Sequence, residues 1–249
     1  MVRYSPGSLD RAAHVQARLD ALAEDFGAWG GARQELLAFV LSPEDWQAAR
    51  MTRAYGLPEA TGANGLALPA WGDEHTIAVW RALLGGSVPW SAGTPVRGTP
   101  EEAATLAAAD LLAQIEVARQ FVDREHLVDG APWLRELLAA TVARAAFDRH
   151  EADRRDEILG FFAALVRGAP PSGPPTEYRE DLPYQQRVAA AAQFFTGAEL
   201  LLQHDRGKTI RRLLKMSRKN GRPLAAADLL ARYPGLGAWL VPGGAANPR

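Results

Sequence analysis

The sequence predicts an α+β fold, with a mixed α/β layer at the N-terminal end and a mainly helical part after it. Short apolar runs bounded by turn residues, typical of strands, occur within the first 80 or so residues. After Pro100, apolar residues recur at helical spacing almost to the end of the chain. The stretch between Gly85 and Pro100 is rich in Gly, Ser, Thr and Pro. We therefore expect two subdomains, residues 1–98 and 99–249, within one larger unit.

The first strand and the first helix are expected within the first 30 residues. Residues 2–4 favour a strand, and a turn sequence leads from them to Ser8. Residues 9–26 have apolar side chains at helical spacing, which predicts a helix. Ser8 is suited to the N-cap of this helix and Gly27 to its end.

The next elements predicted are three strands and a short helix. Residues 36–41 are wholly apolar and precede Ser42-Pro43, which predicts a buried strand followed by a helix over residues 43–50. Residues 62–69 alternate apolar with small residues, and residues 75–80 carry β-branched and aromatic side chains. Both patterns favour strands.

Beyond residue 100 the expected elements are helices. Proline at the first position marks the start of two of them, at Pro100 and Pro132. The helices are expected at residues 100–125, 132–147, 152–167, 184–204, 207–217 and 224–232.

Composition excludes several classes of protein. The 249 residues contain no cysteine, which removes disulfides, thiolate metal sites and cysteine nucleophiles. A net charge of −1 argues against a protein that coats nucleic acid over its whole surface. No apolar stretch reaches the length of about 20 residues that a spanning helix needs, and the first residues lack a signal-peptide core. We expect a cytoplasmic protein without a membrane partner.

Common catalytic signatures do not occur in the sequence. The five histidines are never four residues apart, so no HExxH zinc motif is present. Phosphate-binding glycine loops and the Gly-x-Ser-x-Gly elbow are also missing. We therefore expect neither a metal ion nor another cofactor.

The order of elements, together with one local motif, resembles the peptidase MA-like (gluzincin) zinc metallopeptidases. In that family a long helix carries HExxH, and the next helix begins with a Trp-Leu-x-Glu-Gly-x-Ala segment whose Glu is the third zinc ligand. Here the segment Trp133-Leu-Arg-Glu136-Leu-Leu-Ala139 follows a predicted long helix. The resemblance extends over about residues 1–240 and implies a gluzincin-like fold.

Alignment with the zinc helix places Ile115, Glu116 and Arg119 at the His, Glu and His positions. Glu136 falls at the position of the third ligand, so the resemblance implies a degenerate member that has lost both histidines. One carboxylate cannot hold zinc, which needs three protein ligands, and a guanidinium stays charged and repels a cation. These four positions are expected to be vestigial and not catalytic.

Two interpretations of Arg119 remain open. It lies one helical turn from Glu116, and it can bridge Glu116 and Glu136 so that its fixed charge replaces that of a metal. Alternatively, Glu116 and Arg119 form only a surface pair worth a few tenths of a kcal/mol. The distance from Arg119 to Glu136 decides between them.

The expected function is that of a pseudoenzyme of unknown role that binds a peptide or a protein through the former active-site cleft. The resemblance implies such a cleft, because the enzymes of the family bind extended peptides beside a strand edge. Some members of the family stabilise an oxyanion with a tyrosine, and Tyr184 is a weak candidate for the corresponding residue. An alternative is an active metallopeptidase whose ligands include His126 or His150.

A second alternative is a module that binds polyanions. Residues 206–222 contain no acid after Asp205, and their cations fall partly along one helical stripe. No aromatic residue lies between Phe195 and Tyr233 to stack on bases, so nucleic acid is not the partner we favour. The candidate residues are Lys208, Arg211, Arg212, Lys215, Arg218, Lys219 and Arg222.

Overall fold

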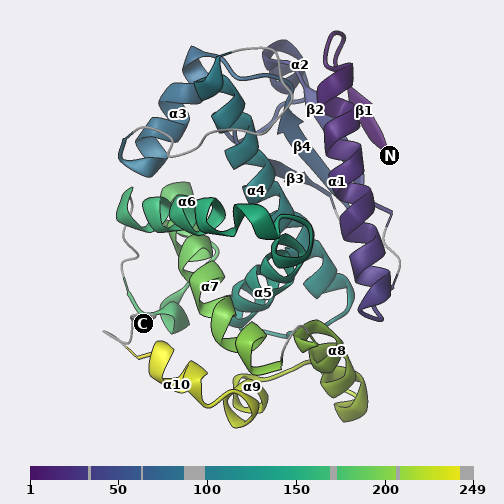
Figure 1. The fold of residues 1–249 in the computed structure, drawn as a ribbon, viewed down its shortest axis with the longest axis vertical. Helices are drawn as coiled ribbons and strands as arrows, with labels where there is room; N and C mark the ends of the chain where they lie inside the picture. Colours follow the sequence, from purple (N-terminus) through teal and green to yellow (C-terminus); the bar gives the residue numbers. More distant parts are fainter. Residues whose placement is uncertain (33–34, 63, 87–98, 169–172, 206–207, 242–249) are drawn as a thin grey trace.

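The computed structural model describes residues 1–32, 35–62, 64–86, 99–168, 173–205 and 208–241. Within these ranges, four short strands form one sheet, and helices cover the sheet and extend beyond it (Figure 1). The fold is therefore α+β, as predicted. Most of the linker in which we placed the subdomain boundary, residues 87–98, lies outside the described residues.

The sheet has the strand order β1-β2-β4-β3. Three strands run parallel, β1 (Val2–Tyr4), β2 (Leu37–Leu41) and β4 (Gly65–Pro69), and all three were predicted. β3 (Glu59–Thr61) pairs antiparallel with β4 at the edge of the sheet and was not predicted. Its three residues are too few to form a recognisable pattern.

The first helix, α1 (Leu9–Ala28), connects β1 to the parallel strand β2. Ser8 is at its N-cap, but the hydroxyl group donates to the carbonyl oxygen of Ser5 at 2.7 Å and does not cap the helix. The helix also continues one residue past Gly27. The helix therefore begins and ends close to the predicted positions, but the prediction that the Ser8 side chain caps it is wrong.

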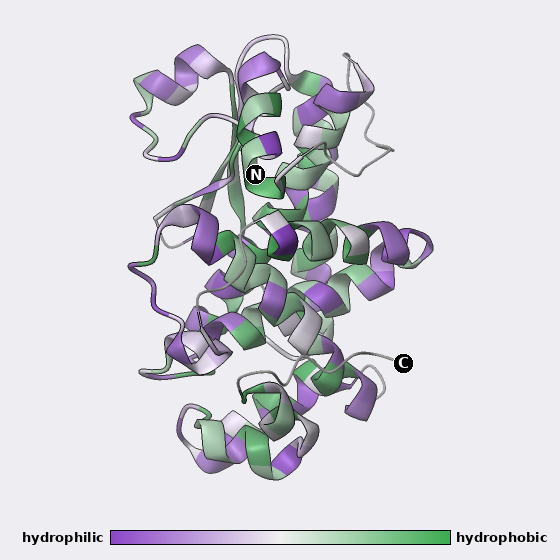
Figure 2. Cartoon of the chain, turned by 90° about the vertical axis from the view of Figure 1, so that its left-hand side faces the viewer, coloured by the Kyte–Doolittle hydropathy of each residue, from purple (hydrophilic) through white to green (hydrophobic). Residues whose placement is uncertain are grey.

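Both faces of β4 are buried, which explains its apolar sequence. Leu66 and Leu68 belong to the main core, whereas Ala67 packs with Trp46 and Tyr55 in a small second cluster. The alternation follows from the two-residue period of a strand. Figure 2 shows hydrophobic residues along the sheet and the central helices, and hydrophilic ones on the peripheral helices.

β2 is less buried than its wholly apolar sequence predicts. Ala38 and Val40 are fully buried, but Leu37, Phe39 and Leu41 are only partly buried. After it, α2 (Pro43–Ala48) starts at the predicted proline, and the hydroxyl of Ser42 accepts the backbone N–H of Asp45 at 3.1 Å.

The strand predicted at residues 75–80 is wrong, because this segment lies within a helix, α3 (Glu74–Leu84). The carboxylate of Asp73 caps the helix by accepting the backbone N–H of Thr76 at 2.7 Å. Trp80 and Leu83 face the core one and two turns after Thr76. Capping and helical spacing outweigh the strand preference of β-branched residues here.

Four long helices form the centre of the helical part, and all four were predicted. α5 packs against both α4 and α7, and α6 packs against α7 (Figure 1). A capping box formed by Thr99 and Glu102 starts the first of them. The helices are α4 (Pro100–Arg124), α5 (Pro132–His150), α6 (Arg155–Gly168) and α7 (Tyr184–Asp205).

Three shorter helices follow α7 in the described part of the chain: α8 (Thr209–Asn220), α9 (Ala226–Arg232) and α10 (Gly235–Trp239). The first two were predicted, and α10 was not. The main core includes buried residues of α1 and of α3 to α10, so these helices share one apolar interior with the sheet, whereas Trp46 of α2 belongs to the second cluster. None of the helices in the described ranges combines the length and apolarity that crossing a membrane requires.

A buried ion pair joins α1 to α4. The guanidinium of Arg11 donates to both oxygens of Asp110, at 2.8 and 2.5 Å, and the side chains are 2% and 3% exposed. Burial raises the pKa of Asp110, but Arg11, His14 and Arg18 together outweigh burial and hold the pKa well below its usual value. The pair joins α1 to α4, the helix that carries Glu116 and Arg119.

Candidate functional site

The helix pair α4–α5 brings together the two carboxylates that the sequence singled out. Glu116 and Arg119 lie one turn apart on α4, and Glu136 lies in the second turn of α5. Arg119 donates to Glu136 through Nε to Oε1 at 2.6 Å and through Nη2 to Oε2 at 2.7 Å. Its Nη1 donates to Glu116. The predicted bridge is therefore present, and the interpretation as a simple surface pair is wrong.

Burial makes this bridge necessary for the carboxylates. The Glu136 side chain is 2% exposed and that of Glu116 13% exposed. Two ionised carboxylates cannot be buried side by side without compensating charge. Burial lowers the pKa of Arg119, but Glu136 and Glu116 outweigh burial and raise it well above its usual value. The guanidinium is thus a permanent cation between two anions.

A second arginine neutralises the remaining charge of the two carboxylates. Arg53, from the loop between α2 and β3, donates from Nη1 to Oε1 of Glu116 at 2.9 Å. The backbone N–H of Arg53 is itself held by Glu59 Oε2 at 2.8 Å. Burial raises the pKa of Glu116, but Arg119 and then Arg53 outweigh it and keep the pKa below its usual value. Two carboxylates and two guanidinium groups balance in this cluster.

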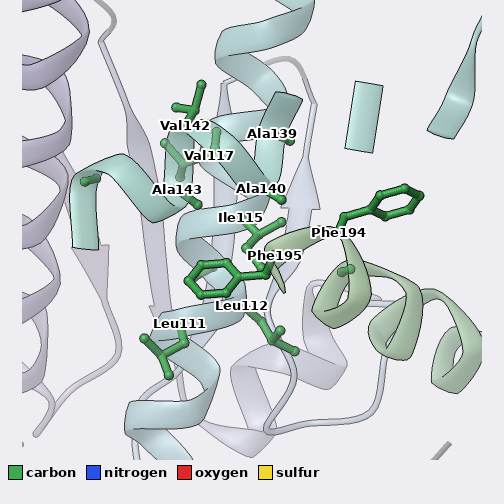
Figure 3. Packing of buried hydrophobic residues seen from close by; sticks show 14 of the residues in the cluster. Leu111, Leu112, Ile115, Val117, Ala139, Ala140, Val142, Ala143, Phe194 and Phe195 are labelled. Atoms are coloured by element: carbon green, nitrogen blue, oxygen red, sulfur yellow. The ribbon is translucent and has the colours of Figure 1, made fainter. Parts of the chain in front are cut away.

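Ile115, at the first aligned histidine position, belongs to the apolar core. The side chain is 2% exposed and lies near Leu112 and Phe195, between α4 and α7 (Figure 3). Leucine, valine and alanine side chains of α4 and α5 pack around it in the same view. An aliphatic side chain in this position contributes packing and no ligand atom.

The carboxylate cluster lies in a cleft with two chambers. The inner chamber, of about 240 Å³, is lined by Glu116, Arg119 and Glu136. The outer chamber, of about 650 Å³, lies along the edge strand β3 and is bounded by α3 and the start of α7. Four residues line both chambers and mark their junction: Arg53, Ala60, Tyr184 and Arg187.

Tyr184 begins α7 at this junction. Its ring lies under the guanidinium of Arg53, with 4.8 Å between Cζ and the ring centroid, and Arg187 lies at 5.6 Å from the same centroid. Burial raises the pKa of Tyr184 to about 12, so the phenol stays protonated near neutral pH. Tyr178, which lines the inner chamber, also has a pKa raised by burial.

The residues present do not fit a zinc ion. Both oxygens of Glu136 and both oxygens of Glu116 already accept from guanidinium groups. A cation would have to displace Arg119, which cannot lose its proton. Over the residues that the structure describes, no three His, Asp or Glu side chains are grouped so that they could hold a metal ion.

The two histidines of the alternative ligand set do not line either chamber. His126 follows the end of α4, is exposed and has a φ of +49°. His150 ends α5, and its Nε2 lies 2.7 Å from Oδ2 of Asp25, which also binds Arg149. The geometry gives no support to an active metallopeptidase that uses these residues.

The basic stretch forms α8, but most of its arginines are already engaged. Arg211 donates to the carbonyl oxygen of Ala28, at 3.0 and 2.7 Å, and Arg212 to Asp205. Two more pair with carboxylates, Arg218 with Glu125 and Arg222 with Asp228. Lys208, Lys215 and Lys219 are exposed and have no carboxylate within 4 Å in the described structure. Arg206 lies outside the described residues.

Sequence reasoning missed three residues of the site: Arg53, Tyr178 and Arg187. Arg53 lies about 60 positions from its partner Glu116, in a loop without a motif, so no local pattern points to it. Arg187 follows Tyr184 by one helical turn, and this spacing is the one signal that could have drawn attention to it.

Comparison of the chain with protein-family models, with curated proteins and with solved structures gives no match.

Proposed function

We propose that this protein binds an extended peptide segment in the two-chambered cleft and does not cleave it. The observation that carries the proposal is the outer chamber, which runs beside β3, the outermost strand of the described sheet. A volume of about 650 Å³ is within the usual range for a ligand site. Extended peptides bind to such strands by adding a strand to the sheet edge.

The carboxylate cluster supports a role without catalysis. Glu116 has the residue type of a general base, but both of its oxygens accept hydrogen bonds, from Arg119 and Arg53. Burial raises the pKa of Glu116, but the two guanidinium groups outweigh burial and keep the pKa below its usual value. A general base needs a pKa near the working pH and a free lone pair facing the substrate. We therefore propose a pseudoenzyme with a gluzincin-like arrangement, whose cleft serves binding alone.

Binding of a labelled peptide pool tests the proposal. Random hexapeptides carrying an N-terminal fluorescein are titrated with the protein, and anisotropy reports binding. Ala60, exposed in the middle of β3, lines both chambers, so Ala60→Trp fills the cleft. We expect saturable binding that Ala60→Trp weakens by about tenfold or more, equivalent to 1.4 kcal/mol.

Two controls make this test specific. Ala13→Trp places the same side chain at an exposed position of α1 away from the cleft and is expected to leave binding unchanged. Mass spectrometry of the pool after incubation is expected to find every peptide intact. Absence of binding, or equal binding by Ala60→Trp, rejects the proposed function, and cleavage rejects its non-catalytic part.

A further inference from the structure

Arg187 differs from the other arginines of the cleft. Four arginines line the two chambers, and three of them bind carboxylates: Arg53 with Glu116, Arg119 with both glutamates, and Arg135 with Asp123. For Arg187, no carboxylate lies within 4 Å and no side-chain N–H group donates to an acceptor among the described residues. A guanidinium with five donors and a permanent charge is left without an anion.

The position of Arg187 increases the cost of this unpaired state. The residue is partly buried, and its Nε is covered by protein without a hydrogen-bond partner. A buried donor without an acceptor costs free energy that a bound acceptor restores. Tyr184 contributes only its ring, at 5.6 Å from Cζ, and it shares that ring with the guanidinium of Arg53. Two cations thus lie at one aromatic ring, and only Arg53 has an anion.

The start of α7 adds further donors at the same place. The first N–H groups of a helix have no partner within the helix, and they favour a negative charge. Within the described structure, the backbone N–H groups of Tyr184 and Gln185 have no acceptor, and both residues line the outer chamber with Arg187. The junction of the two chambers therefore has positive charge and free donors, but no acidic side chain that satisfies them.

We propose that Arg187, with the start of α7, binds a carboxylate of the peptide at the junction of the inner and outer chambers. This inference rests on the proposed function for the identity of the ligand as a peptide. The carboxylate comes either from the C-terminus of the peptide or from an acidic side chain. A guanidinium binds either group through two parallel hydrogen bonds.

Three pools that carry an N-terminal dansyl label, which has no carboxylate, distinguish the two sources. The first has free C-termini and no Asp or Glu, the second is the same pool with C-terminal amides, and the third is amidated with one internal Glu. If Arg187 binds the C-terminal carboxylate, the first pool is expected to bind about 10- to 100-fold more tightly than the second. If it binds an acidic side chain, the third pool is expected to show this difference. Arg187→Gln is expected to abolish the difference. Arg167→Gln, the same charge change on an exposed residue of α6, is expected to preserve it.

A second measurement tests the carboxylate site without a peptide. The Nε–H resonance of Arg187 is identified by its loss in Arg187→Lys and is followed by NMR while sodium acetate is added. A saturable shift supports the site even if no pool binds, in which case only the proposed function fails. Equal binding of all three pools by the native protein, or no shift with acetate, overturns the inference while leaving peptide binding itself intact.

Discussion

Arg119 binds Glu136 through two hydrogen bonds, in which Nε and Nη2 of the guanidinium donate to Oε1 and Oε2 of the carboxylate at 2.6 and 2.7 Å. Paired bonds of this kind are among the strongest between side chains. They join α4 to α5 in the lining of the inner chamber. A fixed positive charge thus occupies the space between the carboxylates of Glu116 and Glu136.

Removal of this charge is expected to destabilise the fold strongly. Arg119→Met leaves the Glu136 carboxylate buried without a partner, and such a change costs about 3–5 kcal/mol. The double variant Arg119→Met with Glu136→Met removes both charges and is expected to recover a large part of the loss. Urea unfolding measures the free energies. A cost below about 1 kcal/mol for the single variant, as for surface pairs, would contradict the buried bridge.

Acid is expected to weaken the fold through Glu116. Its pKa in the folded protein lies below the ordinary value of 4.5, so the unfolded chain binds the proton first as the pH falls. The stability that this group contributes is present above about pH 4.5 and is lost progressively below it.

The comparison variant for this prediction is Glu116→Gln. Between pH 5 and 3, its free energy of unfolding should fall less steeply than that of the native protein, by up to about 1.4 kcal/mol per pH unit for one proton. Urea titrations at several pH values measure the two curves. Parallel curves would show that Glu116 has the same pKa in both states.

Gly197 is expected to be intolerant of any side chain. It lies in α7, where a Cβ would overlap the ring of Trp239 from α10. Gly197→Ala should therefore cost about 1–3 kcal/mol, despite the helix preference of alanine. Trp239→Leu in the same chain should relieve part of this cost.

A glycine with open space provides the matched control. Gly160→Ala in α6 meets no atom within 4 Å and is expected to stabilise the protein by about 0.5–1 kcal/mol. Thermal unfolding of both variants separates steric overlap from helix preference. Equal effects of the two substitutions would mean that α10 does not pack on α7 as described.

Binding of nucleic acid by α8 is expected to be weak. Among the described residues of the stretch, four arginines have partners in the protein and three lysines are left to meet phosphates. The slope of log affinity against log salt for duplex DNA should then not exceed about 3 in magnitude. Filter binding at two salt concentrations measures it, and a slope of 6 or more would favour the polyanion-binding alternative.

Local sequence patterns predicted most of the helices and the three parallel strands, because each pattern lies within one element. α3 was mistaken for a strand, since its β-branched residues concealed the capping aspartate Asp73 and the helical spacing of buried side chains. The pair of Glu116 and Arg119 was predictable because both residues lie on one helix, whereas Glu136, on α5, was included only through the resemblance to the zinc-binding helices. Arg53 and Arg187 were not predictable, because their places in the cleft depend on how distant segments pack.

Zinc content after loading tests the central interpretation most directly. The purified protein is incubated with excess zinc, passed through a desalting column and analysed by mass spectrometry for metals, with Glu136→Gln as the control. Because Arg119 occupies the space between the carboxylates, we expect far less than one zinc ion per chain in both proteins. One zinc ion per native chain, lost in Glu136→Gln, would contradict the pseudoenzyme and favour the alternative of an active metallopeptidase.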